Sequence, residues 1–165
     1  MDFNVGDPVV HWTFGLGKVI GVEERVISDE KALFYLVQIR ELTIYVPVDD
    51  KTGSRLRSPT SSNEFKKLFA ILKGSGEPLS ENRLERKSLL RKGLADGKAE
   101  TICQVIRDLS AMALKKALND DDKNVLRRAQ GLLCAEWGFA FSVPQAQAES
   151  ELQNLLMKPV AVPAS

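Results

Sequence analysis

The sequence predicts an α+β protein in which a small antiparallel β module precedes an all-α helical bundle. Short apolar, β-branched segments separated by turn residues fill the first fifty positions. From residue 61 onward, apolar residues recur at helical spacing instead. A stretch rich in Asp, Gly, Ser and Pro separates the two patterns. We therefore expect a β module at residues 1–50, a linker at 51–60, a helical domain at 61–157 and a flexible tail at 158–165.

Four strand-like segments are expected in the β module. They are rich in Val, Ile, Phe and Tyr, and they occupy residues 8–12, 18–27, 33–40 and 42–48. The pair Gly15 and Gly17 marks a tight turn after the first segment, and a polar break at 28–31 separates the second from the third. Turn signals at intervals of about ten residues indicate a small antiparallel sheet or barrel.

Five helices are expected after the linker. The first follows a capping-box spacing of Ser61 and Glu64. Asn119 offers an N-cap for the fourth helix, where the acidic residues 120–122 are expected to remain solvated at the positive helix end. Trp137 is expected in the core of the bundle, because Leu133 and Phe141 lie four residues to either side of it. The first expected helix carries Phe65, Leu68, Phe69 and Leu72 and is closed by residues 74–78, and the second covers roughly residues 80–95. The third carries apolar residues between positions 102 and 113, the fourth carries them between 125 and 140, and the last covers residues 145–157.

Charge is distributed unevenly along the chain. The 23 Lys+Arg and 22 Asp+Glu give a formal net charge of only +1. However, residues 1–50 have a net charge of −5, residues 51–130 of +8 and residues 131–165 of −2. An acidic first part and a basic middle predict different partners for the two halves.

Signals for catalysis and for metal or cofactor binding are poor. His11 is the only histidine and lies between Val10 and Trp12 in an expected strand, so a structural or exposed role is favoured. The segment 14–18 lacks the spacing of a phosphate-binding loop and precedes a strand rather than a helix. The acidic run 120–122 lacks the alternating ligands of a calcium loop. We expect a protein that is not an enzyme and binds no metal or cofactor.

Composition and the N-terminal segment indicate where the protein is located. No apolar run approaches the roughly 18–20 residues needed to span a bilayer, and the N-terminal segment lacks the basic and apolar regions of a signal peptide. Cys103 and Cys134 both fall on apolar helical positions, as expected of reduced, buried thiols. We therefore expect a cytoplasmic protein that does not contact membranes. We also expect it to act as a monomer.

The second expected helix carries the strongest binding signal. Its residues Arg83, Arg86, Lys87 and Arg91 fall within an arc of about 140°, and Lys92 extends the positive region. Clustered cations neutralise phosphates and give sequence-independent affinity for DNA. The alternative is a solvated helix face with internal ion pairs. Few favourable pairs occur within the helix, which favours DNA, and no recognition helix indicates base-specific readout.

Six short motifs occur in order over about residues 1–157. The N-terminal motifs are Phe3-Asn4-Val5-Gly6-Asp7-Pro8-Val9-Val10, Phe14-Gly15-Leu16-Gly17-Lys18 and Leu42-Thr43-Ile44-Tyr45-Val46-Pro47. Those of the second half are Leu94-Ala95-Asp96-Gly97, Val105-Ile106-Arg107-Asp108-Leu109 and Leu126-Arg127-Arg128-Ala129. Together these motifs resemble those of the CarD/CdnL transcription regulators, whose N-terminal module is also similar to one in transcription-repair coupling factor.

This resemblance implies a Tudor-like β module that docks on the lobe of the RNA polymerase β subunit. The polymerase contacts would fall on the edge strand around Arg25, Val26 and Ile27 and on the strand around Tyr45. It also implies a helical domain that touches promoter DNA without reading sequence and modulates the stability of the open complex. The protein would then associate with the nucleoid through RNA polymerase.

Two departures from the family pattern affect these expectations. Tyr45 replaces a basic residue common on the polymerase-facing strand, so an ion pair is not expected there. The family's promoter-wedging tryptophan aligns with Asn82 or Arg83, neither of which can unstack bases as an indole does. We therefore expect polymerase docking to be retained better than DNA wedging. The alternative is a protein–protein adaptor that binds RNA polymerase or another partner without touching DNA.

Overall fold

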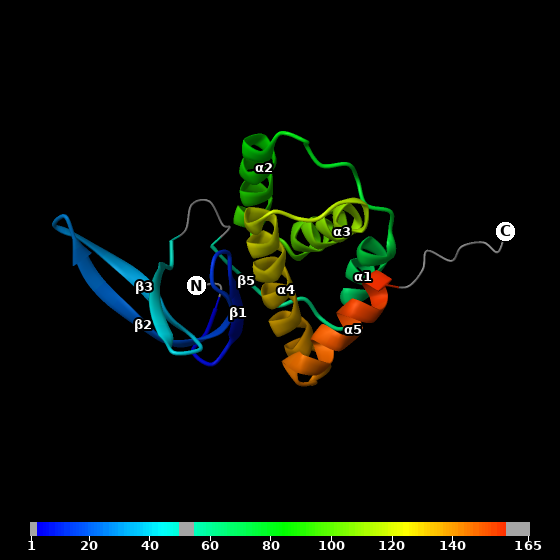
Figure 1. Ribbon diagram of the computed structural model, residues 1–165. Coiled ribbons are helices and arrows are strands. Elements are labelled where there is room, and N and C mark those ends of the chain that lie inside the picture. The colour runs from blue at the N-terminus through cyan, green and yellow to red at the C-terminus, as the bar shows by residue number, and fades with distance from the viewer. Residues whose placement is uncertain (1–2, 50–54, 158–165) are drawn as a thin grey trace. The chain divides into compact units, whose positions relative to one another are not determined.

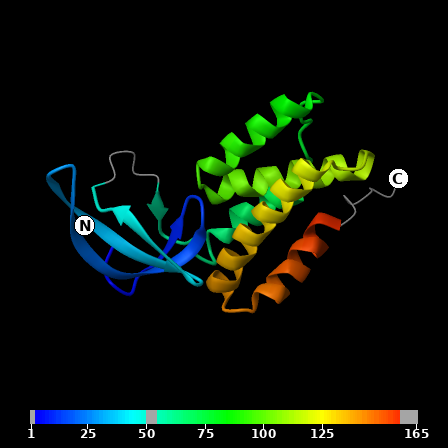
Figure 2. The same ribbon diagram turned by 60° about the vertical axis from the view of Figure 1, so that its left-hand side comes forward.

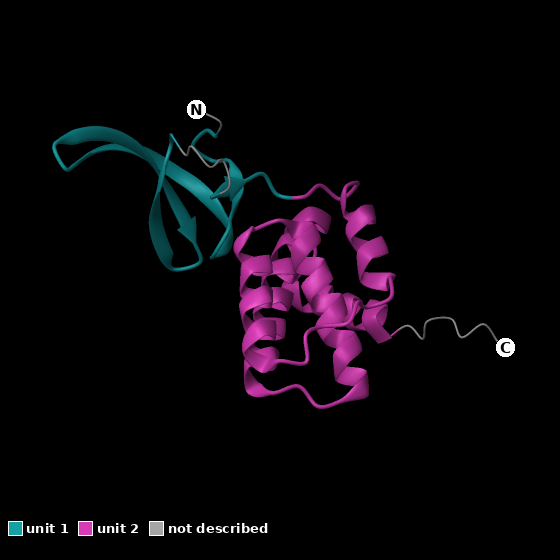
Figure 3. Ribbon diagram, turned by 90° about the horizontal axis from the view of Figure 1, so that it is seen from above, with its two compact units in different colours: residues 1–59 teal, residues 60–165 magenta. Residues whose placement is uncertain are grey.

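The computed structural model describes residues 3–49 and 55–157 of a chain that divides into two compact units, residues 1–59 and residues 60–165 (Figures 1 and 3). The first unit, which we call unit 1, contains strands, and unit 2 contains helices. Each has a hydrophobic core of its own. The α+β class, with a β module preceding a helical part, is thereby confirmed.

Unit 1 is a five-stranded antiparallel sheet with the strand order β4-β3-β2-β1-β5. Alternate residues of the central strands enter its core, notably Val19, Tyr35 and Val37. A Cβ atom at Gly17 would lie 2.6 Å from the carbonyl oxygen of Gln38, so only glycine fits between β2 and β3 there. The strands are β1 (Pro8–His11), β2 (Gly15–Ile27), β3 (Glu30–Ile39), β4 (Leu42–Pro47) and β5 (Leu56–Arg57).

The segment expected as a linker contains the short strand β5. Leu56 is buried in the sheet core, β5 pairs with β1, and the Trp12 N–H donates to the Arg55 carbonyl at 3.0 Å. A two-residue strand is too short to show an alternating pattern, so the sequence did not reveal it. Residues 50–54 of the expected linker and all of the expected tail at 158–165 lie outside the described residues.

Unit 2 consists of five helices around one core. In this unit α4 packs against both α3 and α5, and α2 packs against α3 and α4 (Figure 2). The Ser61 and Glu64 side chains each accept a hydrogen bond from the other's backbone N–H just before α1, as the capping-box spacing predicted. The helices are α1 (Phe65–Lys73), α2 (Arg83–Ala95), α3 (Ala99–Lys115), α4 (Asp120–Phe141) and α5 (Gln145–Met157).

Aromatic and aliphatic side chains fill the core of unit 2. Trp137 is buried, as predicted, with its ring centroid 4.9 Å from that of Phe69 and 5.9 Å from that of Phe65. Cys103 and Cys134 are buried free thiols. Burial raises the pKa of both, that of Cys134 to about 12, so neither is a ready nucleophile. Among the described helices, none is both long and apolar enough to cross a membrane.

Candidate functional site

The hairpin formed by β2 and β3 extends past the rest of the sheet (Figure 1). Its turn has two residues, Ser28 and Asp29, both with positive φ (52° and 66°), as the tight turns that match strand twist require. Pairing of β2 with β1 ends at Lys18. Within the described part of unit 1, no strand therefore pairs with the outer edge of β2 over residues 20–27.

Arg25 and Tyr45 meet on one face of this hairpin. Their partners on β3, Ala32 and Leu36, are four residues apart, which places both side chains on the same face. The Arg25 guanidinium donates to the Tyr45 hydroxyl at 2.7 Å, and its central carbon lies 4.0 Å from the ring centroid. Glu23 lies 3.6 Å from the Arg25 Nε atom. Tyr45 thus holds the arginine by a cation–π contact where a basic residue would repel it.

Exposed apolar side chains lie near the Arg25–Tyr45 pair, on both faces of the hairpin. Val26 is 63% exposed and Ile27 is 54% exposed. Strand alternation places Ile27 on the face of Arg25 and Val26 on the opposite face. Leu33, which sequence reasoning missed, is also exposed and lies on the Val26 face. We call Arg25, Val26, Ile27, Leu33 and Tyr45 the hairpin surface.

The structure changes the expected role of Arg86, one of the five cations assigned to DNA. Its side chain is buried, and Arg86, Leu90 and Leu94 form the buried stripe of α2. The spacing of these residues, i, i+4 and i+8, was visible in the sequence and marks a single helix face. Because that face lies against the bundle, the interpretation of Arg86 as a DNA contact was wrong.

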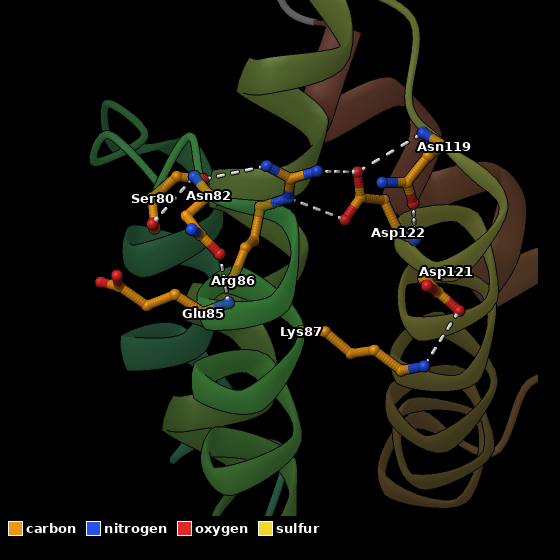
Figure 4. A network of polar contacts seen from close by, with 8 residues as sticks. All are labelled: Ser80, Asn82, Glu85, Arg86, Lys87, Asn119, Asp121 and Asp122. Atoms are coloured by element: carbon orange, nitrogen blue, oxygen red, sulfur yellow. Dashed lines mark hydrogen bonds and ion pairs between the residues drawn. The ribbon is translucent and has the colours of Figure 1, made fainter.

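Arg86 instead joins α2 to the start of α4 (Figure 4). Its guanidinium donates to both carboxylate oxygens of Asp122, at 2.9 and 3.0 Å, and to the Ser80 carbonyl at 2.9 Å. The hydrogen bonds to Asp122 raise the pKa of Arg86 above its ordinary value. Asp122 also completes a capping box with Asn119. Asp122 is therefore buried in a polar network, and the expectation that the whole acidic run stays solvated was wrong for this residue.

Lys87 has a partner on α4 as well. Its ammonium lies 3.4 Å from Asp121 Oδ1, and both side chains remain partly exposed (Figure 4). The sequence argument, that few ion pairs balance the positive charge of α2, considered only pairs within that helix. The carboxylates that pair with Arg86 and Lys87 lie more than thirty positions away in sequence, on another helix.

The remaining expected cations lie on the solvent side of α2. Arg83, Arg91 and Lys92 are exposed, and Leu84 among them is 80% exposed. Leu84 was missed because it lies outside the periodic stripe that contains Leu90 and Leu94. Asn82 is the N-cap of α2 and accepts from the Glu85 N–H at 3.0 Å. We call Arg83, Leu84, Arg91 and Lys92 the α2 outer face.

His11 has a structural role in the turn between β1 and β2. Its Nδ1 atom accepts hydrogen bonds from the backbone N–H groups of Thr13 and Phe14, at 3.0 and 3.2 Å. Burial, followed by the positive charge of Arg55, lowers the pKa of His11 below its ordinary value. The neutral form is the one that accepts both bonds. Across the described residues, no group of three or more His, Cys, Asp or Glu side chains is placed to hold a metal ion.

Comparison with known proteins matches each unit to a known domain family. Residues 3–58 match the CarD-like/TRCF RID domain, and residues 67–153 match the CarD C-terminal domain. The Bacillus subtilis (strain 168) protein named "Putative transcription factor YdeB" is 26% identical to the chain over 151 residues. That alignment covers 90% of this chain and 98% of the relative.

Proposed function

The chain belongs to the CarD family of transcription factors, and on this premise we propose that it docks on the RNA polymerase β subunit and contacts promoter DNA. Unit 1 would supply the docking surface as a Tudor-like module, and unit 2 would modulate the stability of the open complex through DNA contacts that do not read sequence. The protein would act as a monomer, at the nucleoid in the cytoplasm. The observation that carries this proposal is the unpaired edge of β2 beside the hairpin surface.

An open strand edge supports docking on physical grounds. Unpaired backbone N–H and C=O groups can add a strand from a partner, and side chains on alternate faces then give specificity. Val26, Ile27 and Leu33 provide apolar area beside this edge. Arg25 provides a cation for an acidic group of the partner. Because Tyr45 already orients its guanidinium, less conformational entropy is lost on binding.

Co-purification with a fragment of the β-subunit lobe tests the docking proposal. Wild type should retain the fragment, and Arg25→Glu should lose it. Arg40→Glu is the matched control, because Arg40 is exposed at the opposite end of β3 and undergoes the same charge reversal. Equal retention by both variants would contradict the assignment of the hairpin surface. No retention by wild type would contradict docking itself.

The α2 outer face supports the DNA contact. Arg83, Arg91 and Lys92 are exposed cations, whereas Arg86 is withdrawn into the bundle. Each cation that neutralises a phosphate releases counterions, which makes binding salt-dependent and independent of sequence. Leu84 adds an apolar side chain among these cations, and leucine is among the residues that wedge between base steps.

Salt-dependent binding of the full chain to duplex DNA tests this contact. Replacing Arg83, Arg91 and Lys92 by glutamine should lower the slope of log affinity against log salt by about 2.7, because each phosphate contact contributes about 0.9. The control replaces three exposed lysines of α1, Lys66, Lys67 and Lys73, and should change the slope little. An equal loss in both variants would show that general charge, rather than the α2 outer face, holds the DNA.

The alternative is an adaptor that docks on RNA polymerase without touching DNA. The position of Asn82 favours this alternative, since the residue aligned with the family's wedge serves as a helix cap. Footprinting of the polymerase–promoter complex separates the two proposals. An adaptor should leave the upstream promoter contacts unchanged, whereas a DNA-contacting regulator should extend them.

A further inference from the structure

Lys87 lies in a row of cations along α2. Arg83 precedes it by four residues and Arg91 follows it by four, and side chains at this spacing are neighbours on a helix surface. Both neighbours are exposed, whereas Lys87 is half-buried, with its ammonium 3.4 Å from Asp121 Oδ1. The middle cation of the row is therefore occupied by a carboxylate from another helix.

We propose that Asp121 is an internal competitor that occupies Lys87 in place of a DNA phosphate and lowers the affinity of unit 2 for nucleic acid. A carboxylate and a phosphate oxygen offer a lysine ammonium the same kind of charge-assisted contact. DNA that approaches the row must displace Asp121 before Lys87 can bind a phosphate. This inference rests on the DNA contact proposed above.

The burial of the two neighbouring ion pairs explains why one can exchange and the other cannot. The Arg86 and Asp122 side chains are almost fully buried, so solvent and DNA cannot reach their contact. The Lys87 and Asp121 side chains are 32% and 49% exposed, and exposed pairs are weak. Arg86 and Asp122 hold the start of α4 beside α2 and thus keep Asp121 within reach of Lys87 (Figure 4).

A weakened DNA contact would favour binding by tethered protein over binding by free protein. A protein docked elsewhere on the same complex meets the DNA at a high effective concentration, whereas a free protein does not. An internal competitor therefore penalises binding by the free protein, while a tethered one can still overcome it. Asp121 would bias the protein towards DNA that already carries its docking partner.

The adjacent residue Asp120 provides a matched control. Asp120 and Asp121 both lie in the first turn of α4, so each asparagine variant removes one charge from the same helix terminus. Asp121 pairs with Lys87, and within the described residues Asp120 has no ion-pair partner. The difference between Asp121→Asn and Asp120→Asn thus isolates the pair from the change in net charge.

The experiment measures binding of the full chain to a short duplex by fluorescence anisotropy over a range of salt concentrations. Relative to Asp120→Asn, Asp121→Asn should bind about 1.5- to 5-fold tighter, the range expected for an exposed ion pair. Its salt slope should be steeper by about 0.9, from one added phosphate contact. In a Lys87→Gln background this advantage should disappear, which a double-mutant cycle detects.

Three other outcomes would each overturn the inference, and only the last would also overturn the proposed DNA contact. Equal affinities and slopes for the two asparagine variants would overturn the inference and leave the proposed DNA contact intact. A gain for Asp121→Asn that persists with Lys87→Gln would also overturn it, because Lys87 would not be the group released. An absence of DNA binding by wild type and all variants would overturn the DNA contact and this inference together.

Discussion

Replacing Arg86 by methionine should destabilise unit 2 strongly. The change removes three hydrogen bonds of 2.9–3.0 Å, two to Asp122 and one to the Ser80 carbonyl. It leaves the Asp122 carboxylate, only 3% exposed, without its cation. Breaking a buried ion pair from one side costs about 3–5 kcal/mol. A unit of this size is typically stable by roughly 5–15 kcal/mol, so the loss is a large part of the total.

Thermal unfolding followed by circular dichroism at 222 nm measures this loss, because the helical signal comes from unit 2. At about 4–8 °C per kcal/mol for a domain near 100 residues, the midpoint should fall by roughly 12–40 °C. Arg91→Met is the matched control, since Arg91 is an exposed arginine of the same helix. Its effect should stay within about 0.5 kcal/mol.

The double variant Arg86→Met with Asp122→Asn separates lost charge pairing from lost packing. Removing the second charge relieves the unpaired carboxylate, so the double variant should be more stable than the sum of the two single losses implies. An Arg86→Met midpoint indistinguishable from that of Arg91→Met would refute the reasoning. It would mean that the guanidinium is not held in the bundle, and Arg86 would again be a candidate DNA contact.

Three further predictions concern other positions. His11 has a pKa below its ordinary value of 6.5, so its contribution to stability is complete above about pH 6.5 and is lost as pH falls through the lowered pKa. His11→Gln should flatten this dependence, measured by the fluorescence of Trp12 in a Trp137→Phe background, where Trp12 is the remaining indole. Gly17→Ala should destabilise unit 1 by about 1–3 kcal/mol in urea unfolding, because the added methyl meets the β3 backbone, and little change would contradict the close approach. A Cβ atom at Gly131 of α4 would have no neighbour within 4 Å, so Gly131→Ala should stabilise unit 2 by about 0.5–1 kcal/mol; a loss there would indicate an unrecognised contact.

The sequence predicted the helical part well because its signals are local. Apolar spacing places residues on one helix face, and N-caps act within four positions along the chain. Asn119 and Trp137 therefore have the roles expected of them. Arg86 could be interpreted only in part from such local signals. Its spacing with Leu90 and Leu94 marks the buried face, but its partner Asp122 comes from another helix and is visible only in the fold.

The residues of the candidate sites were predicted only in part, because their contacts and exposure depend on tertiary structure. Arg25 and Tyr45 were selected separately by resemblance, and the structure brings them into contact through the register of three strands. Leu33 and Leu84 were missed because exposure of an isolated apolar residue depends on tertiary packing. The burial of Leu56 in a two-residue strand is likewise a property of the assembled sheet.

The distinction between buried and exposed cations changes the salt dependence expected of α2. Its five expected DNA contacts would give a slope of about 4.5 if all neutralised phosphates, at about 0.9 each. Arg86 cannot contribute because it is buried, and Lys87 contributes only when Asp121 releases it. Arg83, Arg91 and Lys92 alone give about 2.7, and Asp121→Asn should raise this to about 3.6. The salt slope therefore depends on which cations of the helix can reach DNA, and the net charge of +8 over residues 51–130 overstates that number.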